Sequence, residues 1–479
     1  MNGTEQQMEI WNEIENGDNH VMVNAGAGTG KTYTIVEGAK LCSGKMAFLC
    51  FNKSIQLELA KRLPEGVNAS TFHAMGMKAL RASGLTRMDK NKNRTIIEGV
   101  LGKDYNWFPL SKLIGLVKGS MVDANNSSHV RQLIDKYNIQ FNDDDDERLA
   151  INRMPLLIQR SLESKSFDFD DMIWMPLALN LAMPKYDVIF VDEAQDFNES
   201  QRQLIYRSVE PDGRCIIVGD KNQAIYGFRG ADSSSMDIFE RLLETTNRGV
   251  SKFPLTLSWR CPSSVVTEAN RFVKDFHGKE DAIEGSVVVN AGFNPVKNDI
   301  VLCRYNAPLV SAFYSLITQG KSAYILGRDM GKGLVSHVKK VSGNNMSMTS
   351  HRFVEDLAKD FRYQYDKLVA KEKTFQANAL EDKVECLNIF ADKASSVGGI
   401  IAEINKLFPY KEGKGDIMLS TVHKAKGLEA NNVYLLATER MPHPKTDNMQ
   451  EEMNICYVAI TRAKVNLYYC GPKPAERVV

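Results

Sequence analysis

A glycine-rich loop between a short apolar run and a helix-forming run constrains the fold of this chain most. The apolar run at residues 20–24 leads into the loop Ala25-Gly26-Ala27-Gly28-Thr29-Gly30-Lys31-Thr32. A strand, a glycine loop and a helix starting at Gly-Lys-Thr predict a phosphate loop, because backbone N–H groups and the positive helix end surround phosphate oxygens. Lys31 is predicted to reach the β- and γ-phosphates, and Thr32 to hold Mg²⁺. The strict pattern has glycine at Ala25, so a plain glycine- and alanine-rich turn is the alternative.

A second apolar run ends in acidic side chains. Residues 186–191 read as a buried strand and lead directly into Asp192 and Glu193. Carboxylates at the end of such a strand hold Mg²⁺ opposite a phosphate loop. We predict that Asp192 is the metal residue and that Glu193 orients and deprotonates the attacking water. A solvated acidic loop would explain Asp196 but not this pair.

The composition is that of a chain with several cores. With 479 residues and 43% hydrophobic content, two to four domains are expected. Because 60 basic residues face 59 acidic ones, a nucleic-acid site would be a local groove rather than a basic tail. The eight cysteines form no CxxC pair, which favours a reducing compartment. We expect no membrane partner and a soluble intracellular protein, cytoplasmic or nucleoid-associated.

Strand and helix patterns alternate in two blocks of the chain. Strands are predicted at residues 46–51, 187–191, 215–218, 299–303, 417–420 and 433–436, with a helix at 53–63 followed by a turn that leads into residues 70–73. Two stretches, 81–167 and 330–412, are polar and mainly helical. The simplest fold is α/β, with parallel sheets in two domains that each carry a helical insert. The first domain is predicted at 1–80 and 168–250, and the second at 251–329 and 413–479.

Several further short motifs follow one another along the chain. They are Thr4-Glu5-Gln6, Cys50-Phe51-Asn52-Lys53, Ser70-Thr71-Phe72-His73, Asp168-Phe169-Asp170-Asp171, Gly219-Asp220-Lys221-Asn222-Gln223, Tyr226-Gly227-Phe228-Arg229, Trp259-Arg260, Thr421-Val422-His423 with Gly427-Leu428-Glu429, and Thr461-Arg462. Together with the phosphate loop and the acidic pair, they resemble superfamily 1A DNA helicases of the UvrD/Rep/PcrA type. The residues of these motifs are most similar to those of the F-box DNA helicase branch. The resemblance covers both α/β blocks and implies two RecA-like P-loop domains.

The resemblance implies an ATP site with Mg²⁺ as the metal. It assigns the adenine contacts to Gln6 and Trp259, a nucleotide contact to Glu429, and γ-phosphate sensing to Gln223. Arg260 and Arg462 are implied to be arginine fingers, which stabilise the charge of the transferred phosphoryl group. One departure is Tyr33, because the bacterial relatives usually carry arginine after Gly-Lys-Thr.

The resemblance also implies a surface for single-stranded DNA and for single-strand/duplex junctions. Its implied DNA contacts are Phe51, Asn52, Thr71, Phe72, His73, Tyr226, Phe228, Arg229 and His423. Rings and a guanidinium bind bases without regard to sequence, because every base has a π-face. For the aromatic residues, packing in a core is the alternative.

The expected activity is that of an ATP-dependent translocase on single-stranded DNA and a DNA helicase, in a family that acts in repair, replication and recombination. The resemblance implies 3′-to-5′ movement. One alternative is a translocase that mainly strips recombinase or other proteins from single strands. Another is a nucleotide-gated DNA-binding protein, against which Glu193, Arg260 and Arg462 argue. The second insert is much shorter than its bacterial counterpart, so regulation by its swinging is not carried over.

Overall fold

The structure, a computed structural model, describes residues 3–50, 53–137, 139, 141–227, 234–370, 373–408, 415–443, 446 and 448–475. The chain divides into two compact units, unit 1 at Met1–Thr256 and unit 2 at Leu257–Val479. Phe51, Asn52, Phe228 and Arg229, which the sequence assigns to DNA, lie outside the described residues.

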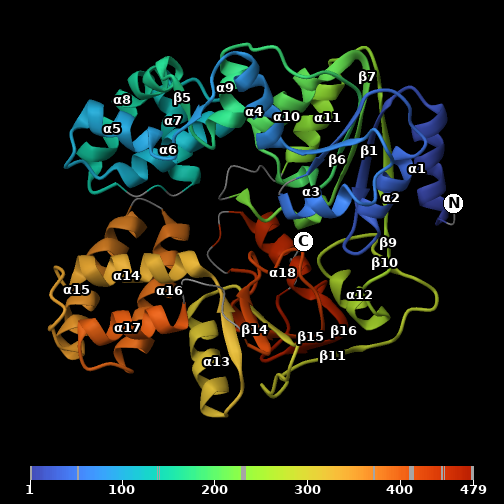
Figure 1. Cartoon of the computed structure of the whole chain (residues 1–479). Helices are drawn as coiled ribbons and strands as arrows, with labels where there is room; N and C mark the ends of the chain where they lie inside the picture. The colour runs from blue at the N-terminus through green and yellow to red at the C-terminus, as the bar shows by residue number, and fades with distance from the viewer. Residues whose placement is uncertain are drawn as a thin grey trace. The chain divides into compact units, whose positions relative to one another are not determined.

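Unit 1 is built on a six-stranded parallel sheet (Figure 1). The strand order is β3-β2-β6-β7-β1-β8, with bounds β1 His20–Ala25, β2 Met46–Cys50, β3 Asn68–Thr71, β6 Tyr186–Val191, β7 Val209–Gly219 and β8 Val250–Leu255. Because all pairs are parallel, the ends of β1 and β6 that carry the phosphate loop and the acidic pair lie on one edge.

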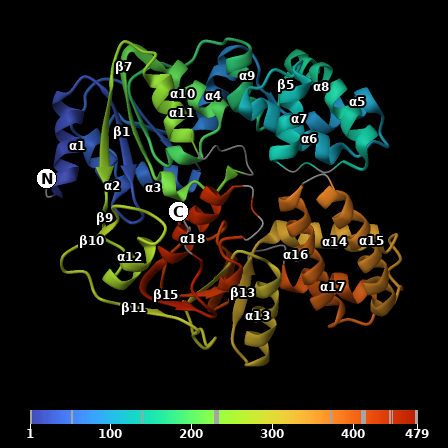
Figure 2. The same ribbon diagram turned by 180° about the vertical axis from the view of Figure 1, so that it is seen from behind.

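Both faces of this sheet are covered by helices, as Figures 1 and 2 show. Successive strand residues point to opposite faces, so Met22 packs in one core and Val21 and Val23 in another. The first core includes side chains from α4 Phe72–Ala82, α9 Asp171–Ala178, α10 Glu199–Ser208 and α11 Ser235–Leu243. The second is closed by α1 Glu5–Asn16, α2 Lys31–Ala39 and α3 Lys53–Leu59.

The first insert has a hydrophobic core of its own. It consists of α5 Lys92–Leu101, α6 Trp107–Ser120, α7 Ser127–Lys136 and α8 Asp144–Glu163, and a short ladder of β4 Arg87–Met88 with β5 Ser166–Phe167 flanks it. The buried side chains of this core all come from residues 97–157.

Unit 2 repeats the architecture with a second six-stranded parallel sheet. Its order is β11-β16-β15-β12-β14-β13, with bounds β11 Ser286–Val288, β12 Ile300–Cys303, β13 Ala323–Leu326, β14 Ile417–Thr421, β15 Ala430–Leu436 and β16 Ala463–Tyr469. A pair of short strands, β9 Leu257–Ser258 and β10 His277–Gly278, lies apart from it. The helices outside the insert are α12 Ser263–Ala269, α13 Ala307–Thr318 and α18 Met449–Ile460.

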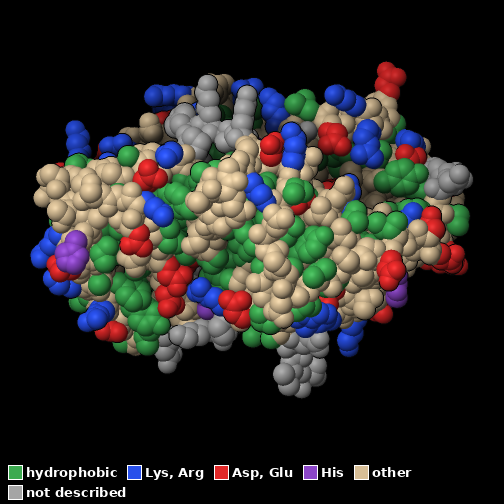
Figure 3. Space-filling model, turned by 90° about the horizontal axis from the view of Figure 1, so that it is seen from below, with side chains coloured by type: hydrophobic (Ala, Val, Ile, Leu, Met, Phe, Trp, Pro, Cys, Tyr) green, Lys and Arg blue, Asp and Glu red, His purple; other side chains and the backbone are tan. Residues whose placement is uncertain are grey.

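The second insert shares its core with the sheet of unit 2. Its helices are α14 Arg328–Val341, α15 Ser350–Ala370, α16 Thr374–Ala391 and α17 Val397–Leu407. Phe353, Phe390 and Ile404 of these helices pack in one cluster with Val301 of β12 and Leu316 of α13. On the face drawn in Figure 3, acidic and basic side chains are interspersed with apolar ones.

The sequence prediction of an α/β fold with two parallel sheets is confirmed, and the predicted strands form, including the one that precedes the phosphate loop. One local prediction is wrong, because the helix after β2 ends at Leu59 rather than at residue 63. The chain then turns at residues 65–66 and leads into β3, which runs to Thr71. The helix α4 starts at Phe72, with the Thr71 hydroxyl capping it. Among the described helices, none is long and apolar enough to cross a membrane.

Candidate functional site

The phosphate loop connects β1 to α2 through two glycines in the left-handed region. Gly28 has a φ of 69° and Gly30 a φ of 84°, which glycine adopts without the steric cost of a Cβ. Gly30 precedes α2 and provides no side-chain cap. The first N–H groups of α2 can therefore point at an anion, as helix N-termini do when they bind phosphate. Thr29 closes the loop by donating its hydroxyl to the Gly26 carbonyl over 3.0 Å.

The acidic pair meets this loop. Thr32 Oγ1 donates to Asp192 Oδ2 over 2.6 Å, and Asp192 is buried. Burial and the charge of the adjacent Glu193 raise the pKa of Asp192 to about 6, while the Thr32 hydrogen bond and the Lys31 charge oppose that rise. A hydroxyl and a buried carboxylate in contact form a donor set that suits Mg²⁺, a cation that prefers oxygen ligands.

Glu193 has an unusual backbone conformation, with φ 56° and ψ 40°. The left-handed region costs a non-glycine residue roughly 1–2 kcal/mol, and such strain concentrates at functional sites. Its carboxylate accepts a hydrogen bond from Gln195 Nε2 over 2.5 Å. The second amide atom of Gln195, Oε1, accepts the Asp220 N–H over 2.9 Å.

A polar chain continues from there to Gln223. Gln223 Nε2 donates to Asp220 Oδ2 over 2.6 Å, and burial raises the pKa of Asp220. A Cβ at Gly219 would lie 2.7 Å from Gln195 Oε1, so the chain needs glycine there. Glu193 is thereby linked to Gln223, three residues before the half-buried Tyr226. Sequence reasoning missed Gln195 and Asp220. In the sequence, these two residues are marked only by their polar character and by their positions inside motifs.

Gln6, the predicted adenine contact, has its amide engaged by Thr256 at the end of β8. Thr256 N donates to Gln6 Oε1 over 3.0 Å, and Gln6 Nε2 donates to the Thr256 hydroxyl over 3.1 Å. The next residue, Gln7, is buried and bonds Thr34 of α2. Tyr33, the departure noted in the sequence, packs edge-on against Trp11.

The predicted DNA residues of α4 have different environments. Phe72 is 1% exposed and packs edge-on against Phe197, so it is a core residue with no ring face left for a base. His73 instead stacks on Phe169, with ring centroids 3.7 Å apart and Phe169 56% exposed. A cavity of about 640 Å³ lies beside them, lined by His73, Phe108 and Phe169 among others. The sequence motif at residues 168–171 contains Phe169, but its residue types alone do not indicate that the ring is exposed.

The predicted arginines and their partners in unit 2 are paired within the unit. Arg260 Nε lies 2.5 Å from Glu429 Oε2, and Lys464 lies 3.5 Å from the same carboxylate. Arg462 is 1% exposed and donates to the carbonyls of Val458 and Leu428. Trp259 is 55% exposed, and His423 is half-buried after β14. The structure therefore brings Arg260 and Glu429 together and holds Arg462 in the interior.

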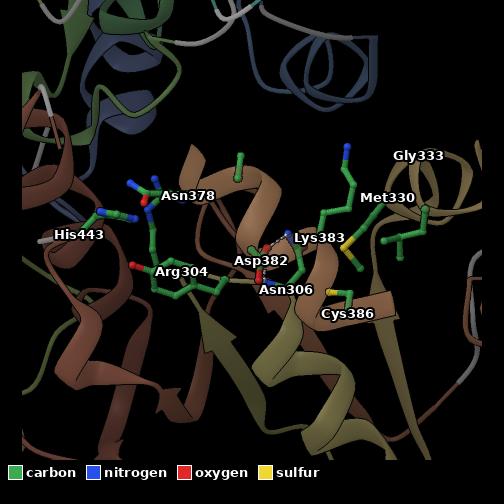
Figure 4. Close-up of a pocket in the computed structure, with 12 residues that line it drawn as sticks. Arg304, Asn306, Met330, Gly333, Asn378, Asp382, Lys383, Cys386 and His443 are labelled. Carbon is green, nitrogen blue, oxygen red and sulfur yellow. Dashed lines mark hydrogen bonds between the residues drawn. The ribbon is translucent and has the colours of Figure 1, made fainter. Parts of the chain in front are cut away.

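A cavity of about 310 Å³ in unit 2 lies where β12 ends (Figure 4). Its lining includes Arg304, Asn306 and His443, together with Asp382 and Lys383 from α16 of the second insert. The Asp382 carboxylate accepts the backbone N–H groups of Asn306 and Ala307 at the start of α13. Arg304 is held by Glu452 at 2.7 Å. The second insert thus caps a helix of the sheet layer.

Comparison with known proteins identifies the family. The UvrD/REP helicase N-terminal domain matches residues 5–244, half of the chain, and the UvrD-like helicase C-terminal domain matches residues 416–469. F-box DNA helicase protein 1 of Schizosaccharomyces pombe is 26% identical over 97% of this chain and 57% of its own length. ATP-dependent DNA helicase PcrA of Bacillus subtilis is 23% identical over 96% of this chain and 82% of its own length.

The chain thus spans little more than half of the length of the yeast relative. A solved structure of arterivirus nonstructural protein 10 (helicase) with DNA aligns at 11% identity and a TM-score of 0.37, over 96% of this chain and 62% of that protein. A likeness this distant carries no argument about function. The two matched domains follow the order of the two sheets along the chain. On the strength of these matches, the chain belongs to the UvrD/Rep helicase family.

Proposed function

We propose that this protein is an ATP-dependent translocase on single-stranded DNA that separates strands as a DNA helicase. The observation that carries the proposal is the contact of Thr32 with Asp192 beside the phosphate loop, at 2.6 Å. It joins the phosphate-binding and acidic motifs at one point, as nucleotide hydrolysis requires. The names of the relatives, which are DNA helicases, support the same reading.

In this proposal the residues of unit 1 bind and hydrolyse ATP. The α2 N-terminus and Lys31 bind the phosphates, and Thr32 and Asp192 would hold Mg²⁺, which supplies positive charge to the phosphoryl oxygens. Glu193 takes the proton of the attacking water. Gln195 keeps the Glu193 carboxylate in position through its 2.5 Å hydrogen bond. Arg260 and Arg462 are proposed to add charge stabilisation from unit 2, with Trp259 and Gln6 at the adenine.

Single-stranded DNA is the proposed second substrate. The exposed ring of Phe169, stacked on His73, presents an aromatic surface beside an open cavity. Base stacking on such a ring is sequence-tolerant and contributes about 1–3 kcal/mol per base. Burial lowers the pKa of His73 to about 4, so its imidazole is neutral near pH 7 and suits stacking rather than phosphate binding. Tyr226 is a further proposed contact, and movement is proposed to run 3′-to-5′.

The decisive experiment measures steady-state ATP hydrolysis with and without single-stranded DNA, followed by strand separation on 3′-tailed and 5′-tailed duplexes. We expect DNA to stimulate hydrolysis and the 3′-tailed duplex to be separated. DNA-independent hydrolysis with tight binding would favour a nucleotide-gated binding protein. Stimulated hydrolysis without strand separation, but with removal of a recombinase from single strands, would favour the stripping translocase.

A further inference from the structure

Four buried charged side chains lie where the first insert joins the sheet of unit 1. Lys92 belongs to α5 and Lys118 to α6 of the insert, while Asp168 precedes α9 and Asp171 begins it. Lys118 and Asp171 are 0% exposed, and the other two are also buried. We call these four residues the charge cluster.

The charge cluster is closely paired. Lys92 Nζ lies 2.6 Å from Asp171 Oδ2, and Lys118 Nζ lies 2.8 Å from Asp171 Oδ1. Lys118 also lies 3.3 Å from Asp168, and Lys92 donates to the Ser161 carbonyl over 2.7 Å. Two positive and two negative charges balance. Buried charges are tolerated only when they are paired in this way, and removing one leaves another uncompensated.

The two carboxylates also fix the backbone between them. Asp168 N donates to Asp171 Oδ2 over 3.0 Å, and Asp171 N donates to Asp168 Oδ1 over 2.9 Å. Each aspartate therefore holds the other's backbone while it pairs with a lysine of the insert. Phe169, which lies inside this turn, is directed outward and stacks on His73.

We propose that the charge cluster consists of positioning residues, which hold Phe169 in place for single-stranded DNA and make its position depend on the seating of the first insert. This inference rests on the proposed function. It adds that Lys92 and Lys118, which are buried away from any ligand, act on DNA affinity through the turn. The reciprocal backbone bonds have the form of a capping box at the start of α9, and they enclose the exposed ring between two aspartates that the lysines of the insert hold.

The test compares Lys118→Met with a matched control, Ile134→Ala, in the same insert. Ile134 is buried in the core of the first insert, outside the charge cluster, so its truncation weakens the insert without removing a charge. We expect Lys118→Met to raise the DNA concentration for half-maximal ATPase stimulation about tenfold, as loss of one stacked base would. DNA-free hydrolysis should be unchanged. Amide exchange at residues 168–171 should accelerate in Lys118→Met and not in the control.

A double-mutant cycle with Phe169→Ala decides whether the effect passes through the ring. If it does, Lys118→Met should add little to Phe169→Ala, because the positioned group is already absent. Additive losses, or equal losses in Ile134→Ala, would overturn the inference while leaving the proposed function intact. Absence of DNA stimulation in the unaltered protein would instead overturn the proposed function. Should Lys118→Met fail to fold, Lys118→Met with Asp168→Asn removes one charge of each sign and serves in the same cycle.

Discussion

Thr32 and Asp192 are joined by a 2.6 Å hydrogen bond although 160 residues separate them in sequence. Thr32 lies in the first turn of α2, and Asp192 follows β6, which is two positions away from β1 in the sheet order. The parallel sheet is what makes the two motifs meet, because it aligns the ends of β1 and β6 on one edge. Single substitutions at this edge of the sheet should therefore change ATP turnover strongly.

Lys31→Ala and Glu193→Gln should both abolish ATP turnover, for different reasons. Loss of Lys31 removes charge at the phosphates, so nucleotide binding should weaken as well. Loss of the Glu193 carboxylate removes the base while the neighbouring Thr32 and Asp192 remain, so that variant should bind ATP and retain it. Hydrolysis rates and nucleotide affinity measured on both proteins test this. DNA-stimulated hydrolysis at the normal rate by Glu193→Gln would exclude it as the base.

Arg260→Ala should lower turnover by about 10³-fold or more, as loss of an arginine finger does. Lys464→Ala is the matched control, because Lys464 contacts the same Glu429 carboxylate and is assigned no role in phosphoryl transfer. ATP affinity and melting temperature should change little in either variant. A loss below tenfold in Arg260→Ala, about 1.4 kcal/mol of barrier, would rule out the finger role.

Arg462→Ala should lower turnover and stability together. Its side chain is buried and donates to two backbone carbonyls, so truncation leaves a cavity and unpaired acceptors. We expect a loss of about 3 kcal/mol or more in the free energy of unfolding. Urea unfolding measures this cost, and turnover is then compared at a temperature where the variant stays folded. An unchanged rate per folded molecule would show that Arg462 is structural only.

Phe169→Ala should weaken single-stranded DNA binding by about 1–3 kcal/mol, the value of one stacked base. Because the ring is exposed, the free energy of unfolding of this variant should change little. For Phe72→Ala we expect the opposite, because loss of this buried ring should lower the free energy of unfolding by about 3–5 kcal/mol. Fluorescence anisotropy with labelled single strands and thermal melting separate the two effects. Equal DNA affinity in Phe169→Ala and the unaltered protein would exclude this ring from the DNA surface.

His20 should make the protein labile to acid. Its Nδ1 accepts the Cys215 N–H over 3.0 Å, and burial, with the charges of Arg248 and Arg214, lowers the pKa of His20 to about 4. The neutral imidazole is favoured in the folded state, so stability is complete above pH 6.5 and falls as the pH drops from 6.5 to about 4. The loss should be about 3 kcal/mol over that range. Unfolding of His20→Gln should depend less steeply on pH, while the exposed His351→Asn should match the unaltered protein.

Much of the site could be predicted because its functional residues lie in short contiguous motifs. The apolar runs before Ala25 and Asp192 identify strands, and both acidic and phosphate-binding residues follow a strand end directly. The parallel fold then places them together. The aromatic residues were harder, because exposure depends on tertiary packing: Phe72 is in the core, whereas Phe169 is exposed.

Links between motifs could not be predicted from sequence either. Gln195 bonds both Glu193 and Asp220, and a glutamine in a loop carries no signal for two such partners. The strand β8 was missed because it is an edge strand with mixed burial, which weakens the alternation that marks a strand. The charge cluster is a third case, since Lys92 and Lys118 look like surface lysines in a polar helical stretch.

The two inserts differ in a way that bears on how the chain can be rebuilt. The buried core of the first comes from its own residues, so exchanging it for another helical bundle should disturb unit 1 at two places, the charge cluster and the contacts of Ile158 and Leu162 of α8 with α4 and α9. The second lends Phe353, Phe390 and Ile404 to the core beneath β12, and Asp382 to the start of α13. Excising it would uncover the apolar side of unit 2. The first insert is therefore the better candidate for exchange. The second completes the hydrophobic core of unit 2, so its removal should expose apolar side chains and promote aggregation.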